Sequence, residues 1–261
     1  AVIAMLLYIF FRYLKLFRDQ VSQLKRMNTE MDAARKEAEQ ANMAKQDFLS
    51  SMSHDIRTPM NAIIGMTSLA LENTDNPEQV RDYLGKIALS SKHLLGLIND
   101  VLDISKIESG KMTLNVEPVS LNAVMDGIVN IIQPQVKAKN QQFKVTAHDI
   151  LSEDVCCDGV RLNQVLINLL GNAVKFTPEK GSVQLTVYQE ALPEDASRVR
   201  THFLVSDTGI GMSKEYQKVI FESFSREDNS RVRKTEGSGL GMAITKYIVD
   251  AMGGTISVCS E

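Results

Sequence analysis

Apolar residues recur at helical spacing from residue 17 to residue 108, and this pattern is broken only once. The break is the turn-forming run Asn73-Thr74-Asp75-Asn76-Pro77, and Pro77 suits the first turn of a second helix that ends at Ser109-Gly110. Each predicted helix carries an apolar stripe, and two helices of this length cannot bury both stripes alone. We therefore expect a helical hairpin that dimerises into a four-helix bundle.

Residues 12–45 fit a heptad pattern that leads directly into the hairpin. When Phe17 is placed at the first a position, Gln20 and Lys45 are the polar residues among the a and d positions through Phe48. This pattern predicts a parallel two-helix coiled coil with a weak, Ala-rich seam. Such a seam suits a linker that changes its packing in response to a signal, and a passive spacer is the alternative interpretation.

The first eleven residues, AVIAMLLYIFF, are uncharged and almost wholly apolar. A helix of this length spans about 17 Å, roughly half of the hydrocarbon layer of a bilayer. We interpret residues 1–11 as the inner end of a transmembrane helix whose start lies before the first residue. Arg12, Lys15 and Arg18 follow at once, so the positive-inside rule places residues 12–261 in the cytoplasm. The core of a signal peptide is the alternative, although no cleavage site follows.

Charge and cysteine content argue against two classes of protein. The 29 Lys and Arg residues are balanced by 32 Asp and Glu residues, which gives a formal net charge of -3 and argues against a nucleic-acid partner. Cys156 and Cys157 are adjacent, and Cys259 lies far along the chain. Because three cysteines without a CxxC motif support neither a disulfide framework nor a zinc site, they suit a reducing compartment.

The first hairpin helix carries a histidine between two polar side chains, in the run Ser53-His54-Asp55-Ile56-Arg57-Thr58-Pro59. His54 falls about 200° around the helix from the stripe that contains Met52 and Ile56, so we expect it to face solvent. A carboxylate such as that of Asp55 can accept a hydrogen bond from one ring nitrogen, which leaves the other nitrogen free as a nucleophile. Thr58 follows one turn later, with a hydroxyl able to hold a water. An ordinary solvated histidine is the alternative for this residue taken alone.

After Gly110, short strands alternate with helices. We predict strands at 116–121, 142–147, 183–188, 202–206 and 255–258, helices at 122–139, 159–176 and from about residue 240, and a polar loop at 191–200. The strands are few and are spaced almost as hairpins. This predicts one mixed sheet with helices on one face.

Two asparagines lie four residues apart on the predicted helix 159–176. Asn168 and Asn172 therefore stack on one helix face, and Lys175 follows nearly one turn later. Amide oxygens suit Mg²⁺, which keeps water and phosphate oxygens as its other ligands, and a lysine suits a phosphate. An asparagine pair alone is more often an ordinary surface feature.

Two glycine clusters follow. Asp207 ends a predicted strand and is followed by Gly209 and Gly211, so its carboxylate can accept a hydrogen bond from an exocyclic amine while the glycines allow a ring to approach. The run Gly237-Ser238-Gly239-Leu240-Gly241 leads into a helix, whose free amides can bind phosphate. Either cluster alone is weak evidence, since a tight turn is the alternative. Their order and spacing after the asparagine pair predict a nucleotide site.

Taken together, these motifs resemble those of the sensor histidine kinases. His54 to Pro59 is similar to the H box of that family, Asn168 to Lys175 to its N box, Asp207 to Gly211 to its first glycine box, Phe221 to Phe224 to its F box, and Gly237 to Gly241 to its second glycine box. The ordered match covers residues 46–261. The runs SHDIRTPMNAIIGM and KFTPEKG are similar to those of hybrid sensor kinases of bacteria. The resemblance implies an ATP-binding α/β sandwich of the kind shared with gyrase and heat-shock protein 90.

The resemblance also implies a role for each matching residue. It makes His54 the phosphoacceptor, with Asp55 orienting its ring and accepting its proton. Thr58 would position water for the reverse, phosphatase reaction on the partner. Asn172 would be the main Mg²⁺ ligand with Asn168 beside it, Lys175 would contact phosphate, and Asp207 would accept the adenine amine. Residues implied in ATP binding besides these are Gly209, Gly211, Phe221, Phe224, Gly237, Gly239, Leu240 and Gly241. Residues 212–236 would form a mobile lid with the two phenylalanines as its apolar anchors.

We therefore expect a multi-domain protein of α and α+β class. Its predicted parts are the end of a transmembrane helix at 1–11, a coiled-coil linker at 12–45, a dimerisation and phosphotransfer domain at 46–110, and an ATP-binding domain at 111–261. The expected function is autophosphorylation of His54 from ATP with Mg²⁺, followed by transfer to an aspartate of a response-regulator receiver domain, by a homodimer at the bacterial inner membrane. Alternatives are a phosphatase-biased or degenerate member of the family, an ATPase of the gyrase or chaperone type, and a purely structural coiled coil.

One departure from the family concerns the end of the chain. Members normally continue with a further hairpin strand, whereas this sequence ends at Glu261, after the predicted strand 255–258. We expect that strand to form an unpaired edge and the nucleotide domain to be less stable than an extended version.

Overall fold

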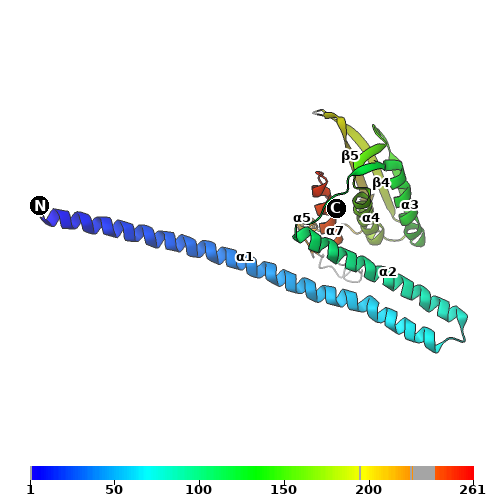
Figure 1. Ribbon diagram of the computed structural model, residues 1–261. Helices are drawn as coiled ribbons and strands as arrows, with labels where there is room; N and C mark the ends of the chain where they lie inside the picture. The colour runs from blue at the N-terminus through cyan, green and yellow to red at the C-terminus, as the bar shows by residue number, and fades with distance from the viewer. Residues whose placement is uncertain (1, 194, 224, 226–238) are drawn as a thin grey trace. The chain divides into compact units, whose positions relative to one another are not determined.

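The computed structural model describes residues 2–193, 195–223, 225 and 239–261. The chain divides into two units, residues 1–57 and residues 58–261. Helix α1 (Val2–Glu72) enters both units without interruption, as the periodicity predicts, and contains Pro59 (Figure 1). Association of two chains along residues 12–45 stays a prediction.

The first unit consists of the N-terminal part of α1. Many of its large apolar side chains are exposed, among them Ile3, Tyr8, Phe10, Phe11 and Phe17, whereas Met52 is buried. Among the residues that the structure describes, no helix combines the length and the apolarity that crossing a membrane requires.

Helix α2 (Pro77–Glu108) follows the predicted turn. Asn76 is its N-cap, since its side chain accepts a hydrogen bond from the backbone N–H of Gln79, and Pro77 occupies the first turn. Ser109 caps the other end, and Gly110 follows in the left-handed conformation with φ of 64°. Several large apolar side chains on one face of this helix stay exposed, including Leu84, Leu95, Ile98 and Leu102. This surface is the one that the predicted four-helix bundle would bury.

The strands of the second unit form two sheets, where the sequence predicts one. In the larger sheet, β2 (Gln142–Ala147) runs parallel to the central strand β4 (Ser182–Leu192), which pairs antiparallel with β5 (Asp195–Asp207). The sheet is therefore mixed, as predicted. The smaller sheet pairs β1 (Glu117–Ser120) with β3 (Asp154–Cys157), a strand that was not predicted.

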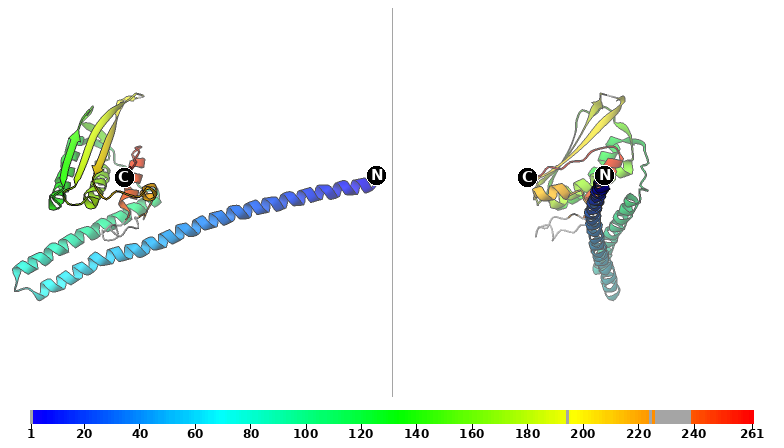
Figure 2. Two further views of the ribbon diagram at one scale, coloured as in Figure 1. Left: turned by 180° about the vertical axis from the view of Figure 1, so that it is seen from behind. Right: turned by 90° about the vertical axis from the view of Figure 1, so that its left-hand side faces the viewer.

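Two helices cover one face of the larger sheet (Figures 1 and 2). Helix α3 (Leu121–Ala138) and helix α4 (Gly159–Phe176) form a core with alternate residues of β4, whose even spacing follows from the two-residue period of a strand. Fully or almost fully buried members of this core are Ile128, Ile132, Leu166, Leu170, Val183 and Leu185.

Two further predictions about secondary structure are wrong. Residues 191–200 belong mostly to the ends of β4 and β5, because the ladder continues past the buried part of the sheet. The side chains of Asp195, Arg198 and Arg200 are exposed there. Residues 255–258 lie outside any strand of the described chain. They lead to Ser260, whose hydroxyl accepts from the backbone N–H of Met212 and whose carbonyl accepts from the Gln217 side chain. The chain end is thus held beside helix α5 (Lys214–Val219) rather than by a ladder.

Candidate active site

The phosphoacceptor candidate lies on α1 within the first unit. The His54 side chain is 79% exposed, and its Nδ1 lies 3.4 Å from Oδ1 of Asp55. In the tautomer that carries its proton on Nδ1, the ring donates weakly to this carboxylate, so Nε2 keeps its lone pair. Thr58, four residues later, is also exposed. The exposure of the ring suits a nucleophile that must meet a second molecule.

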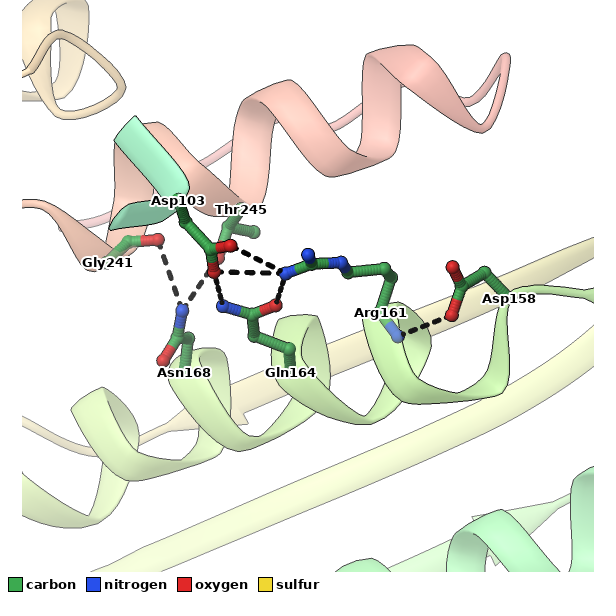
Figure 3. A network of polar contacts seen from close by, with 7 residues as sticks. All are labelled: Asp103, Asp158, Arg161, Gln164, Asn168, Gly241 and Thr245. Carbon is green, nitrogen blue, oxygen red and sulfur yellow. Dashed lines mark hydrogen bonds and ion pairs between the residues drawn. The ribbon is translucent and has the colours of Figure 1, made fainter. Parts of the chain in front are cut away.

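The asparagine pair lies on α4, which begins at a well-formed cap. Asp158 accepts hydrogen bonds from the backbone N–H of Arg161 and from that of Asn115. Asn168 then donates from Nδ2 to the carbonyl of Gly241, at 3.3 Å, and to Oγ1 of Thr245, at 3.5 Å (Figure 3). Because the carbonyl must face an N–H donor, the amide oxygen of Asn168 lies on the opposite side of the group. Asn172, one turn further, is partly exposed.

The second glycine cluster meets the asparagine helix at the start of α7 (Gly241–Ala251). A Cβ on Gly241 would lie 3.6 Å from the side chain of Asn168. Gly239 has φ of 70°, a conformation that favours glycine, and Leu240 is fully buried. The structure therefore brings Asn168 and this cluster together, as the predicted site requires. Gly237 lies outside the described residues.

The first glycine cluster follows β5. Asp207 Oδ1 accepts a hydrogen bond of 2.8 Å from the backbone N–H of Gly209, which fixes the turn beside the carboxylate. A Cβ on Gly209 would lie 3.0 Å from the carbonyl oxygen of Phe176, so this turn packs directly on the end of α4. Gly211 has φ of 67°, and a Cβ there would clash with the backbone of Glu261. Close packing therefore requires glycine at both positions.

The remaining predicted residues lie in the same unit. The Lys175 ammonium lies 4.8 Å from the centroid of the Phe176 ring, at the last turn of α4. Phe221 is partly buried just after α5, whereas Phe224 and most of the predicted lid lie outside the described residues. His54 and Asp55 belong to residues 1–57, and the other predicted site residues that the structure describes belong to residues 58–261.

A polar cluster next to Asn168 was not predicted from the sequence (Figure 3). Asp103 of α2 accepts hydrogen bonds from Arg161 Nη1 at 3.1 and 3.0 Å and from Gln164 Nε2 at 2.8 Å. Arg161 also donates to Gln164 Oε1 at 2.6 Å. The signal available in the sequence was slight: two polar residues three apart in the first turns of an apolar helix. Asp103, the partner of these two residues on α2, is far from them in the sequence and could not be identified.

The donor set is compatible with a magnesium ion that the nucleotide itself helps to bind. Within the described part of the chain, no group of three or more His, Cys, Asp or Glu side chains is placed to hold a metal. The Asn168 amide keeps its oxygen available, and Asn172 lies one turn away on the same helix. Two amide oxygens form a weak site alone and a sufficient one when phosphate oxygens and waters complete the shell.

Comparison with protein families gives two matches. Residues 44–110 match the His Kinase A (phospho-acceptor) domain, and residues 157–261 match the histidine kinase-, DNA gyrase B- and HSP90-like ATPase. The chain is 38% identical over 244 residues to the signal transduction histidine-protein kinase BarA of Escherichia coli, which covers 94% of this chain and 26% of BarA. It is 40% identical over 243 residues to the sensor histidine kinase GacS of Pseudomonas protegens, covering 93% and 26%.

Two solved structures have a fold similar to that of this chain. Full-length ShkA in complex with AMPPNP is 32% identical with a TM-score of 0.57, over 78% of this chain and 41% of ShkA. The histidine kinase AdeS of Acinetobacter baumannii shares the fold, with a TM-score of 0.55 at 22% identity, over 80% of this chain and 91% of AdeS. The chain belongs to the sensor histidine kinases. It spans about a quarter of the length of BarA and GacS.

Proposed function

We propose that this chain is an ATP-dependent protein-histidine kinase that phosphorylates His54 and passes the phosphoryl group to an aspartate of a receiver domain. The observation that carries the proposal is the contact between Asn168 and Gly241. This contact joins the asparagine helix to the second glycine cluster, which supports a single site to which Asn168, Asn172 and the amides at the start of α7 would all contribute.

Each described residue then has a chemical task. Asp207 accepts the adenine amine, and the glycines beside it let the ring approach. Asn168 and Asn172 hold Mg²⁺, which neutralises the phosphates, while the amides at the start of α7 and the Lys175 ammonium bind them. Phosphoryl transfer depends mainly on positioning and on charge neutralisation, so these groups suffice for the nucleotide side of the reaction.

His54 supplies the nucleophile. Its Nε2 attacks the γ-phosphorus, the bond from that phosphorus to the β,γ-bridging oxygen breaks, and ADP leaves. The Asp55 carboxylate, 3.4 Å from Nδ1, stabilises the positive charge that develops on the ring. The product is a phosphohistidine on an exposed side chain, which a second protein can reach.

The proposal extends to the setting of this chemistry. The exposed apolar side chains of α2 support a homodimer, with the heptad of residues 12–45 continuing it as a coiled coil. The exposed apolar residues at the start of α1, followed by Arg12, Lys15 and Arg18, support attachment of the N-terminal end to the bacterial inner membrane. Residues 12–261 would then lie in the cytoplasm.

The test is incubation of the chain with γ-labelled ATP and Mg²⁺, beside His54→Gln and the control His93→Gln. His93 is an exposed histidine on α2 outside every predicted motif. We expect an acid-labile, alkali-stable label on the parent chain and on His93→Gln, and none on His54→Gln. A label that survives in His54→Gln, or a parent chain that binds ATP without becoming labelled, would contradict the proposal.

A further inference from the structure

A lysine outside every predicted motif binds the C-terminal end of α4. Lys139, which caps α3, donates from Nζ to three backbone carbonyls, those of Val174 at 2.9 Å, Lys175 at 2.8 Å and Thr177 at 3.3 Å. The Lys139 side chain therefore binds the C-terminal end of α4, the helix that carries Asn168 and Asn172.

A buried glutamine joins the same carbonyls. Gln141 is 8% exposed, and its Nε2 donates to Val174 at 3.0 Å, to Thr177 at 2.7 Å and to Pro178 at 3.3 Å. Because all three partners are acceptors, they identify the nitrogen of the amide group. Lys139 and Gln141 lie two residues apart, in the turn between α3 and β2.

These contacts supply what a helix end lacks. The last carbonyls of a helix have no intrahelical partner, and they form the negative end of the helix dipole. Two such carbonyls, those of Val174 and Lys175, accept hydrogen bonds here from the Lys139 cation. The carbonyls of Thr177 and Pro178, just beyond the end of α4, accept from the Gln141 amide. The position of the turn 176–178 is consequently determined by Lys139 and Gln141 as well as by the core.

The turn 176–178 packs against the segment proposed to recognise adenine. A Cβ on Gly209 would lie only 3.0 Å from the carbonyl oxygen of Phe176. Gly181 fits as tightly, since a Cβ there would meet the Thr177 side chain and, at 3.0 Å, Oγ1 of Thr208. Thr208 in turn accepts from the backbone N–H of Ser182 at 2.9 Å. A shift of the turn would therefore move the backbone that directly follows Asp207, at Thr208 and Gly209.

We propose that Lys139 and Gln141 are positioning residues for nucleotide binding, which act by holding the turn 176–178 against the Asp207–Gly209 segment. The inference rests on the proposed ATP site. It adds two residues, which contact neither metal nor phosphate and which set the alignment of the adenine acceptor.

The test compares Lys139→Met with Lys137→Met. Methionine keeps an unbranched side chain and removes the three donors, and Lys137 is an exposed lysine in the last turn of the same helix. Binding of Mg-ATP and of Mg-GTP to the whole chain is measured by calorimetry, well below the unfolding temperature of each variant. We expect the Kd for ATP to rise about tenfold in Lys139→Met, since hydrogen bonds from a charged donor are lost, and to stay unchanged in Lys137→Met.

Two further readouts separate positioning from general loosening of the fold. Asp207 would accept a hydrogen bond from the amine of adenine, and guanine carries a carbonyl at that position. Misalignment of the Asp207 carboxylate in Lys139→Met should therefore reduce the preference for ATP over GTP. Lys139→Arg keeps the charge and the donors, and we expect it to restore most of the affinity. Gln141→Met should act in the same direction as Lys139→Met and serves where Lys139→Met does not fold.

The outcomes are distinct. Unchanged ATP affinity in Lys139→Met and Gln141→Met overturns the inference alone. An equal loss of affinity for ATP and GTP, with no rescue by Lys139→Arg, also overturns it and leaves a role in stability. A parent chain that binds no ATP overturns the proposed function and this inference with it.

Discussion

Asp103 on α2 and Arg161 on α4 form a largely buried ion pair, in which Nη1 of the arginine lies 3.1 and 3.0 Å from the two carboxylate oxygens. Gln164 completes the shell of the carboxylate. A buried ion pair often contributes little net stability, because desolvation of both charges offsets their attraction. Removal of one partner is costly all the same, since the other charge is then left buried alone.

Asp103→Ala should therefore destabilise the chain strongly. We expect a loss of roughly 3 kcal/mol in the free energy of unfolding, measured by urea titration at one protein concentration. Asp82→Ala is the matched control, because Asp82 forms an exposed pair with Lys86 on the same helix and its loss should cost below about 0.5 kcal/mol. The charge swap that combines Asp103→Arg with Arg161→Asp should recover part of the loss. Equal effects of the two alanine variants would contradict this account.

Asn172→Ala should abolish the Mg²⁺-dependent part of ATP affinity while the chain stays folded. Asn172 is partly exposed on α4, so its removal leaves no cavity in the core. Asn163→Ala is the control on the same helix, where the side chain bonds to the Gly159 carbonyl far from the glycine clusters. Titration of ATP with and without Mg²⁺ checks the prediction, and a Mg²⁺ effect that persists in Asn172→Ala would refute the assignment.

Asp158→Ala should shorten or fray the start of α4. Asp158 caps this helix and also accepts from the backbone N–H of Asn115, and it is 6% exposed. Loss of the cap and of a second bond should cost about 2 kcal/mol of stability. Asp126→Ala, at an exposed position of α3, should be nearly neutral. Hydrogen exchange of the first turn of α4 would show the local effect, and unchanged protection there would speak against it.

Cys157 should react slowly with iodoacetamide. Burial raises the pKa of its thiol, and the neighbouring Asp158 and Cys156 raise it further. A raised pKa means less thiolate at any given pH, so the alkylation rate should increase only at a pH higher than an ordinary thiol requires. A variant that retains only Cys157 is compared with one that retains only the exposed Cys259. The two rates should converge in urea, and equal rates in the folded state would disprove the prediction.

The sequence predicts local features of this chain well and distant contacts poorly. Helix α1, the turn at Asn76 and the start of α2 follow from periodicity and capping, which depend on neighbouring residues. Strand β3 escaped prediction because four residues that include two cysteines carry little periodicity. The strand predicted at 255–258 has the right composition, but strand formation requires a partner that composition does not specify.

The same distinction holds for the site. Asp207, Asn168 and Gly241 could be proposed from the sequence as site residues because their motifs are short and ordered along the chain. The roles of Asp103 and Lys139 depend on which helix ends meet after folding, and a single sequence contains no such signal. The contacts of Lys139 span 35 residues or more in sequence, and only the fold brings them together.

Helix α1 contains a proline at position 59, five residues after His54. Proline has no N–H, so the carbonyl of Asp55 loses its usual helical partner, and the hydrogen-bond ladder is interrupted at this one level. A long helix with such a gap is least stiff in torsion where the bond is missing. A twist applied at the N-terminal end would therefore change the helical dihedral angles mainly close to His54, instead of being distributed evenly along the helix.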